Sequence, residues 1–430
     1  SRSRPRCLSR PWEQSAPMKL LVALCLTLQP WLGRAARVPR HGPPLALVAK
    51  QGSHQGSHSK SRAMTSAYPF YHSTDDIQLE LRALAERCPG MTLESRGQER
   101  PIDVVTIRAL GSKPANRFFG LFGEHSRELI SPESGLHLVR TLCGETDLAP
   151  QAAAVLRDSE FQIVVNGNPA SRKKVEEGRY CLRTNPNGVD LNRNWDEQWQ
   201  PSALLDPTDT NPGPRPFSEP ETQVFKELVE AYRPTTFLTI HSGTKGMYMP
   251  WAFDMQHLAQ RNQPRMMQVL RSLDKDHCQC PFGAAGKEVG YSCPGTCLDW
   301  VYDNLKTPYA FAFEIYTDPE LNSLLRERWQ EKMNSAGAFY QAHSHLAHQH
   351  FHDLFAEHPS CFVQLREGHS QRHRGIMTND ECFAQFNPGT EEEYTGVVEN
   401  WSAAYLELAA MVSADLKNGL ASNTTVSTVL

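Results

Sequence analysis

The chain has little net charge and few basic segments. Its 430 residues carry a formal net charge of −4. No basic run or stripe of basic and aromatic residues stands out beyond Arg372-His373-Arg374, which argues against a nucleic-acid partner. This length suits one large domain or two ordinary ones. These properties favour a roughly neutral enzyme with no nucleic-acid partner.

The chain also lacks an apolar run that is long enough to span a bilayer. The run Leu20 to Leu28 is too short, and it lies between the charged start Met18-Lys19 and small residues at Gly33 to Ala36. This order is typical of a secretory signal. We therefore expect a leader over residues 1–36 with its signal peptide starting at Met18, and a secreted, secretory-pathway or vacuolar protein. A disordered apolar leader with no sorting role is the alternative.

Cysteine pairs of the C-x2-C type, the usual hooks of a zinc ribbon, are missing. The chain has 11 cysteines, and removing Cys7 and Cys25 with the leader leaves an odd number, so at least one thiol is free. We expect disulfides, in agreement with a secretory leader. The expected pairs link Cys278 and Cys280 with Cys293 and Cys297 across a loop, and Cys361 with Cys382. A zinc ribbon made from the first four cysteines is the alternative.

Composition divides the chain into one domain with flanking segments. Residues 37–67 are rich in Gly, Ser, His and Pro, which predicts a disordered linker. The domain is expected over residues 68–417, with an insertion at about 318–382, and residues 418–430 form a polar tail. The insertion contains a histidine run from His343 to His352 on a predicted helix. A solvated polar helix is the simpler interpretation of this run, and a second metal site is the alternative.

Strand-like and helical segments alternate along the domain. Strands are predicted at 102–107, 118–122, 161–165, 235–240 and 308–315. Helix starts are predicted at Ser73, at Ser131 before Pro132, at the capping box Ser218-Glu219-Pro220-Glu221, and at Thr390. This alternation predicts an α/β fold: a single catalytic domain with a central mixed, mostly parallel β-sheet flanked by helices.

Four ionisable residues lie where apolar runs end. They are His125 and Glu128 after 118–122, His241 at the end of 235–240, and Glu314 within 309–315. Open sheets bind ligands at the carboxyl ends of their strands. Catalytic zinc takes three nitrogen or carboxylate ligands and leaves a fourth position open for water. The pattern therefore predicts one zinc held by His125, Glu128 and His241, with Glu314 left free as a general base.

The surrounding motifs resemble those of the M14 zinc carboxypeptidases, the carboxypeptidase A/B family. The segment Gly123 to Glu133 is similar to the family's metal-binding segment. Further matches follow in order: Asn168-Pro169, Leu182-Arg183-Thr184-Asn185, Gly188 to Trp195, Ile240-His241-Ser242 and Phe313-Glu314-Ile315. The similarity runs from about Tyr68 to about Val412, interrupted by the insertion. It implies a fold of the zinc-exopeptidase type.

The resemblance implies catalytic roles for two residues outside the ligand set. Glu314 would take the proton of the zinc-bound water and pass it to the leaving amine. Arg183 would stabilise the tetrahedral intermediate, because its charge is permanent. A surface salt bridge is the alternative for Arg183.

The resemblance also implies a set of substrate-binding residues. Asn192 and Arg193 match the pair that binds the free carboxylate of the substrate. Tyr291 matches the mobile tyrosine that closes over the C-terminal end of the substrate. Arg127 matches an accessory arginine further out. Leu298 matches the floor of the side-chain pocket, so apolar termini are expected to be preferred over basic ones.

Together these features predict a zinc-dependent metallocarboxypeptidase that acts on the C-termini of peptides or proteins, with one zinc per chain. We expect a monomer. We also expect activity without tryptic cleavage, because residues 37–64 are too few for a folded inhibitory domain. Two alternatives stay open: a catalytically silent module that binds C-terminal carboxylates, and an amidohydrolase that acts on something other than peptides. The presence of Glu314 favours the enzyme.

Overall fold

The computed structural model describes residues 64–201, 210–321, 323–324 and 377–420. The leader, the linker up to residue 63, Cys361 and the histidine run lie outside the described residues. Residues 64–67, placed in the linker by the sequence, instead form the short helix α3 (Met64–Ala67), in which Met64 is buried. No helix in the described part of the chain is long and apolar enough to cross a membrane.

One eight-stranded sheet runs through the domain in the order β1-β2-β4-β3-β5-β8-β6-β7. The strands are β1 (Met91–Arg96), β2 (Ile102–Ile107), β3 (Asn116–Phe122), β4 (Ser159–Val164), β5 (Thr236–His241), β6 (Lys245–Met249), β7 (Phe282–Ala284) and β8 (Tyr309–Ile315). The central strands β4, β3, β5 and β8 are parallel, as are β6 and β7, while the other three pairings are antiparallel. The predicted mixed, mostly parallel sheet is therefore confirmed.

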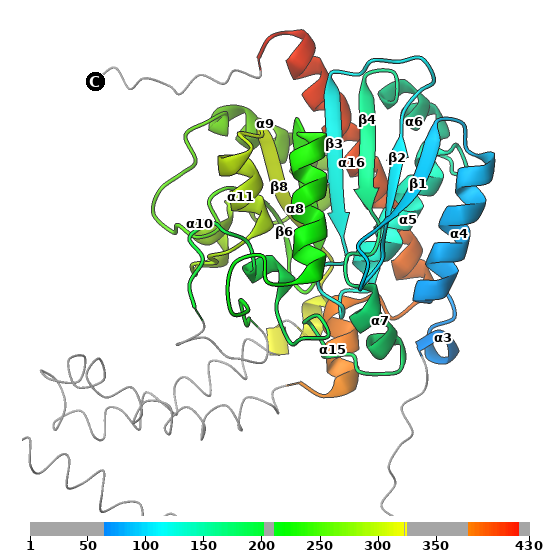
Figure 1. Cartoon of the computed structure of the whole chain (residues 1–430), viewed down its shortest axis with the longest axis vertical. Coiled ribbons are helices and arrows are strands. Elements are labelled where there is room, and N and C mark those ends of the chain that lie inside the picture. The colour runs from blue at the N-terminus through cyan, green and yellow to red at the C-terminus, as the bar shows by residue number, and fades with distance from the viewer. Residues whose placement is uncertain (1–63, 202–209, 322, 325–376, 421–430) are drawn as a thin grey trace, which may run out of the picture. The chain divides into compact units, whose positions relative to one another are not determined.

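Helices cover both faces of this sheet, with α8 in front of the central strands and α16 behind them (Figure 1). The longer helices are α4 (Thr74–Arg87), α5 (Ile130–Leu142), α6 (Ala149–Val155), α7 (Pro169–Glu176), α8 (Pro220–Tyr232), α9 (Gln263–Leu273), α11 (Cys297–Asn304), α15 (Asn379–Phe386) and α16 (Glu391–Lys417). The central strand residues are almost completely buried between the two helical layers. The α/β fold follows from this layered packing.

Two of the four predicted helix starts are confirmed. Ser73 caps α4 in a reciprocal capping box with Asp76. Thr390 caps α16 by accepting a hydrogen bond from the amide of Glu393. Each cap satisfies a backbone amide that has no partner within the helix.

The other two starts were placed wrongly. Helix α5 begins at Ile130 with Leu129 as its N-cap, because the Ser131 hydroxyl has another use. It donates to the carbonyl of Ile240 at 2.7 Å and accepts from the amide of Gly123 at 3.0 Å. Helix α8 is preceded by Glu219 with no side-chain cap, since the hydroxyl of Ser218 donates to the carboxylate of Glu219.

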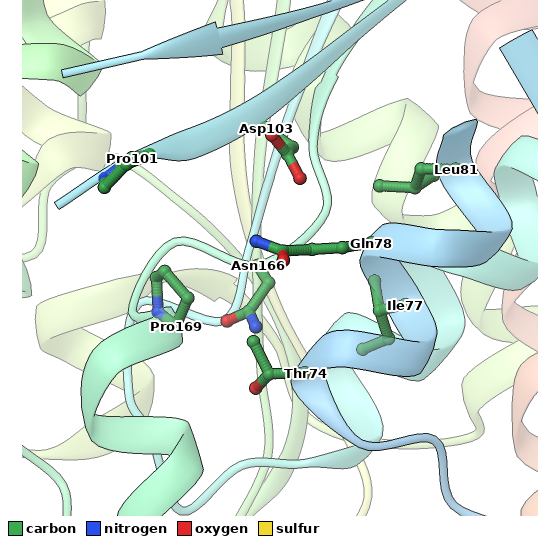
Figure 2. A pocket seen from close by; sticks show the side chains of 8 residues that line it. All are labelled: Thr74, Ile77, Gln78, Leu81, Pro101, Asp103, Asn166 and Pro169. Carbon is green, nitrogen blue, oxygen red and sulfur yellow. The ribbon is translucent and has the colours of Figure 1, made fainter. Parts of the chain in front are cut away.

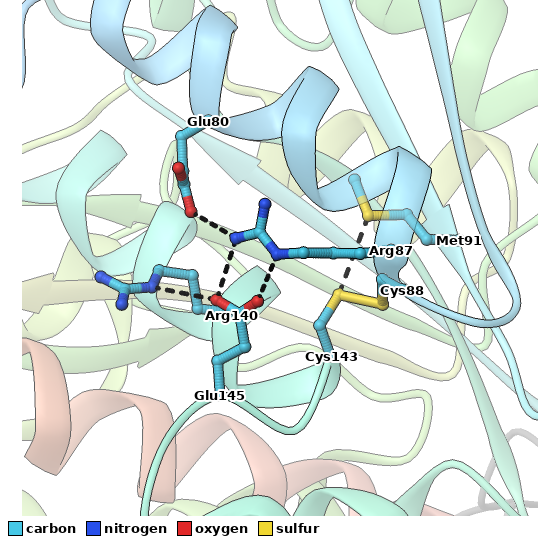
Figure 3. Close-up of a disulfide and its surroundings, with 7 residues drawn as sticks. All are labelled: Glu80, Arg87, Cys88, Met91, Arg140, Cys143 and Glu145. Atoms are coloured by element: carbon cyan, nitrogen blue, oxygen red, sulfur yellow. Dashed lines mark hydrogen bonds and ion pairs between the residues drawn. A yellow bond between two sulfur atoms is a disulfide. The ribbon is translucent and has the colours of Figure 1, made fainter.

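Three disulfides are present among the described residues: Cys88–Cys143, Cys181–Cys382 and Cys278–Cys280. Figure 3 shows the first, which joins the end of α4 to the end of α5. The expected pairings were wrong, because the chain brings Cys278 to Cys280 and Cys181 to Cys382, while Cys293 and Cys297 are free and buried. The expectation of disulfides itself is confirmed.

A small polar cavity lies between α4, β2 and the start of α7 (Figure 2). Its volume is about 10 Å³. Asp103 Oδ2 and both side-chain polar atoms of Asn166 have no hydrogen-bond partner among the described residues. A polar space of this size suits one bound water molecule, and it is too small for a substrate.

Candidate metal centre and active site

Strand register brings the predicted site residues to one edge of the sheet. Parallel pairing aligns Phe122 of β3 with Ile240 of β5, and His241 of β5 lies directly opposite Glu314 of β8. The loop after β3 then supplies His125, and Glu128 lies two residues before α5. Residues that are far apart in sequence therefore meet at the carboxyl ends of three neighbouring strands.

His125, Glu128 and His241 form a buried cluster. Their ligand atoms lie within 4.8 Å of one another. The Nδ1 atom of His125 is 2.7 Å from Glu128 Oε1 and 3.1 Å from Nδ1 of His241. Nδ1 of His241 is in turn 3.2 Å from Glu128 Oε2. All three predicted ligands thus point at one centre.

Asp190 supports this cluster, and the sequence analysis did not include it among the site residues. Its Oδ1 atom lies 3.1 Å from Nε2 of His125, and it is completely buried. A carboxylate behind a histidine fixes which ring nitrogen carries the proton. Its position two residues before Asn192, in a matched motif, was the available signal.

The donor set suits zinc. With the proton on Nε2 beside Asp190, the lone pair of His125 Nδ1 faces Nδ1 of His241 at 3.1 Å. Two imidazole nitrogens and one carboxylate are the usual ligands of a catalytic zinc, which keeps one position open. His125, Glu128 and His241 would therefore hold the ion.

The carboxylate and the imidazoles stabilise each other's charges. Burial alone would raise the pKa of Glu128, but His125 and His241 hold it well below its usual range. Burial lowers the pKa of His241, whereas the hydrogen bond to Glu128 and the charges of nearby carboxylates raise it to about 9. Glu128 is therefore ionised at neutral pH, as a metal ligand must be.

Glu314 lies beside the cluster without belonging to it. Its side chain is partly exposed, but its Oε2 atom is buried and has no hydrogen-bond partner among the described residues. Burial and the charge of Glu128 raise its pKa to about 7, while His241 and Arg183 act in the opposite direction. A carboxyl group with such a pKa can both accept and return a proton near neutral pH.

Arg183 lies at the same edge and is mostly buried. Its Nε atom donates to Asp190 Oδ2 at 2.9 Å, and Nη1 lies 3.5 Å from Glu128 Oε1. Its side chain is only 13% exposed, so the pair is not a surface salt bridge. The guanidinium charge is thereby held next to the cluster.

Asn192 and Arg193 lie together in a short 3-10 turn (Leu191–Arg193) that is capped by the Asp190 carboxylate. The side-chain carbonyl of Asn192 accepts a hydrogen bond from the amide of Cys297 at 3.0 Å. Arg193 Nη1 donates to the carbonyl of Asn192 at 2.7 Å, and its charge acts on both Asp190 and Tyr291. The side-chain amide of Asn192 lies 3.4 Å from Nε2 of His241, so the turn faces the cluster.

The three remaining predicted residues differ in their burial. Arg127 lies over the ring of Phe386, 4.2 Å from its centroid. Tyr291 is 58% exposed, yet the charges of Arg193 and Arg183 act on it. Leu298 is 2% exposed, in the first turn of α11. The substrate roles of these residues stay predictions.

A second potential metal-binding group consists of Asp274, Cys278 and Cys280. The two cysteines form a disulfide with each other, so neither offers the thiolate that zinc requires. The zinc-ribbon alternative is therefore wrong for these cysteines.

Known proteins share the sequence pattern. Residues 77–335 match the family described as zinc carboxypeptidase, Peptidase_M14. Carboxypeptidase A2 of Mus musculus is 24% identical over 285 residues, covering 60% of this chain and 65% of that protein. Carboxypeptidase B2 of Homo sapiens is 25% identical over 290 residues, covering 62% and 68%. The chain thus spans about two thirds of the length of these relatives.

Solved structures share the fold. Thrombin-activatable fibrinolysis inhibitor superposes with a TM-score of 0.59 at 17% identity, covering 84% of this chain and 79% of that one. Carboxypeptidase A from Helicoverpa armigera superposes with a TM-score of 0.56 at 16% identity, covering 83% of this chain and 80% of that one. At such identities the likeness concerns the fold alone. Because the family match extends over more than half of the sequence, this chain belongs to the M14 zinc carboxypeptidase family.

Proposed function

We propose that the protein is a zinc-dependent metallocarboxypeptidase that releases single residues from the C-termini of peptides or proteins. One observation carries this proposal: a buried His-Glu-His cluster lies beside Glu314, whose Oε2 has no partner among the described residues and whose pKa is raised to about 7. A metal site of structural use alone needs no free carboxylate next to its ligands. We expect one zinc per chain and a monomer.

A bound zinc would supply a water of lowered pKa and would polarise the scissile carbonyl. Glu314 accepts the proton of the attacking water at its free Oε2 atom and returns it to the leaving amine. Arg183 places a permanent positive charge where the carbonyl oxygen becomes negative. Asp190 holds both His125 and Arg183, and so fixes the position of a ligand relative to the cation.

Recognition of a free C-terminus is assigned to Asn192 and Arg193. A guanidinium offers a carboxylate two parallel hydrogen bonds, and the turn that carries these residues is fixed through Asp190 and Cys297. The exposed ring of Tyr291 can move over that end. These properties support an exopeptidase over an enzyme that cleaves within chains.

We assign the floor of the side-chain pocket to Leu298. An apolar floor cannot pair a buried cation, and such a charge left unpaired costs several kcal/mol. Peptides that end in Phe or Leu are therefore expected to give a higher kcat/KM than peptides that end in Lys. A preference for Lys would contradict this assignment, and a gain on Lys in Leu298→Asp would support it.

The experiment compares one peptide with a free and with an amidated C-terminus, with and without a zinc chelator. A metallocarboxypeptidase releases the last residue only from the free form, and zinc restores the activity lost to the chelator. Tight binding of the free form without turnover would instead identify a silent carboxylate-binding module. Hydrolysis of acylated amino acids but not of peptides would identify an amidohydrolase.

The cellular location and activation are also proposals. Three disulfides accord with an oxidising compartment. We assign the protein to the secretory pathway, to the lumen of a vacuole or to the outside of the cell. Activity without prior tryptic cleavage would agree with our interpretation of residues 37–64. Strict dependence on cleavage would contradict it.

A further inference from the structure

We propose that Glu124 is a positioning residue for the metal ligand His241, and that it acts through the hydroxyl group of Thr239. This inference rests on the proposed zinc site. It concerns a carboxylate that neither the ligand set nor the catalytic steps use. The zinc affinity of the protein is the property that it would control.

The hydroxyl of Thr239 lies between the two groups. Its Oγ1 atom is 2.8 Å from Glu124 Oε2 and 2.8 Å from Nε2 of His241. A hydroxyl has one proton to donate. When that proton goes to the carboxylate of Glu124, the oxygen must accept the second hydrogen bond, which requires a proton on Nε2 of His241.

This arrangement determines which nitrogen of His241 faces the metal site. With the proton on Nε2, the lone pair is on Nδ1, the atom 3.2 Å from Glu128 Oε2. The side-chain amide of Asn192 is also near Nε2, but at a longer distance of 3.4 Å, and its carbonyl end is held by the amide of Cys297. The shorter contact with Thr239 therefore decides the tautomer.

Local geometry explains why these residues meet. Thr239 and His241 are two positions apart on β5 (Thr236–His241), so their side chains leave the same face of the strand. Glu124 directly precedes His125 in the loop after β3. The distal nitrogens of both ligand histidines are thus connected to carboxylates: His125 directly to Asp190, and His241 through a hydroxyl to Glu124.

The environment of Glu124 does not suit a purely structural role. Glu124 is 1% exposed, and its Oε1 atom has no partner among the described residues. Besides Thr239, its Oε2 atom lies near the thiol of Cys297 at 3.4 Å and near Nε2 of His241 at 3.5 Å, which is longer than either bond of the Thr239 hydroxyl. Glu133 is equally buried, but Arg172, His72 and Tyr394 all bond to its carboxylate. A buried carboxylate with so few partners is costly. A cation held by His241 would offset that cost.

The experiment measures the zinc dissociation constant by competition with a chromogenic chelator. Glu124→Gln removes the charge, and Thr239→Val removes the hydroxyl while keeping the shape of the side chain. Loss of a group that orients a metal ligand typically weakens binding about 10- to 100-fold. Each variant is expected to bind zinc at least about 10-fold more weakly, and Thr239→Ser, which keeps the hydroxyl, should retain the affinity of the parent protein.

The double variant of Glu124→Gln with Thr239→Val gives a sharper test of whether Glu124 acts through Thr239. If Glu124 acts through Thr239, the double variant binds zinc no more weakly than the weaker single variant. Additive losses in the double variant would overturn the connection, and unchanged affinity in Thr239→Val would overturn the proposal.

Glu133→Gln is the matched control, because it alters a buried carboxylate away from the cluster. It is expected to lower the melting temperature without changing zinc affinity. If Glu124→Gln does not fold, the pair Thr239→Val and Thr239→Ser still decides the outcome. Zinc affinity is measured without substrate, so tight zinc binding without peptide hydrolysis would refute the proposed function and leave this inference intact.

Discussion

The site has a strand-end half and a loop half, and they are positioned by different forces. The strand-end half comprises His125, His241 and Glu314, which lie at or just beyond the ends of β3, β5 and β8. The loop half comprises the segments 181–193 and 291–298. Backbone register aligns the first half, whereas side-chain hydrogen bonds and a disulfide hold the second. The strand-end half should therefore determine metal binding and proton transfer, and the loop half substrate binding and stabilisation of the developing negative charge.

Specific hydrogen bonds and one disulfide hold the segment 181–193 against the strand-end half. The hydroxyl of Ser126 donates a hydrogen bond to the carbonyl of Leu182 at 2.7 Å. The backbone amide of Ser126 donates to the carbonyl of Arg183 at 3.1 Å. The disulfide Cys181–Cys382 joins this segment to α15. Because Arg183 lies two residues from this disulfide, its position depends on a bond that connects residues 201 positions apart.

The largest expected effect is in the strand-end half. Glu314→Gln keeps the shape of the side chain but cannot accept the proton of the water. We expect kcat to fall by at least about 10²- to 10⁴-fold, with zinc content unchanged by elemental analysis. Near-normal turnover in this variant would show that the general base lies elsewhere.

The pH dependence tests the same group. Only the ionised form of Glu314 accepts a proton, and its pKa is raised to about 7 by burial and by Glu128. Bound zinc, being positive, shifts that pKa downward. The logarithm of kcat/KM should thus fall with unit slope as the pH decreases through an acid limb at or below about 7. An activity independent of pH between 4 and 8 would contradict this role.

Removal of the loop-half disulfide should have a smaller effect on catalysis. Cys181→Ser with Cys382→Ser frees the segment that carries Arg183, so we expect a higher KM and a lower kcat at unchanged zinc content. The free energy of unfolding should fall by about 2–4 kcal/mol.

The matched control is Cys88→Ser with Cys143→Ser, the disulfide of Figure 3, which lies on α4 and α5. It should lower stability by a comparable amount and leave the kinetic constants unchanged. Equal kinetic losses in both double variants would mean that the two disulfides act only through global stability. Stability is measured by urea denaturation, and KM with a single peptide series.

The smallest expected effect is at the exposed edge of the loop half. Tyr291→Phe removes a hydroxyl from a ring that is 58% exposed. A few-fold rise in KM is expected, since a single hydrogen bond contributes about 0.5–1.5 kcal/mol. A fall in kcat as large as that of Glu314→Gln would instead place Tyr291 in the chemical step.

The sequence predicted the strand-end half better than the loop half. Apolar runs located β2, β3, β4, β5 and β8, and ionisable residues after them located the cluster. Strands β1, β6 and β7 were missed. Strand β1 is a mostly exposed strand at the edge of the sheet, while β6 and β7 are five and three residues long and lack a clear apolar pattern. The helix start predicted at Ser131 was wrong, because the hydroxyl of this residue bonds to the backbone near the ends of β3 and β5 and does not cap its own helix.

The sequence by itself determined the α/β class, the family and the identity of the clustered residues, because buried strands require apolar runs and motif order survives in the chain. Only the tertiary structure decided the partners of Cys181 and Cys278, the support of His125 by Asp190, and the link from Glu124 through Thr239 to His241. These depend on distances between segments that do not adjoin in the chain, and local sequence patterns carry no information about such distances.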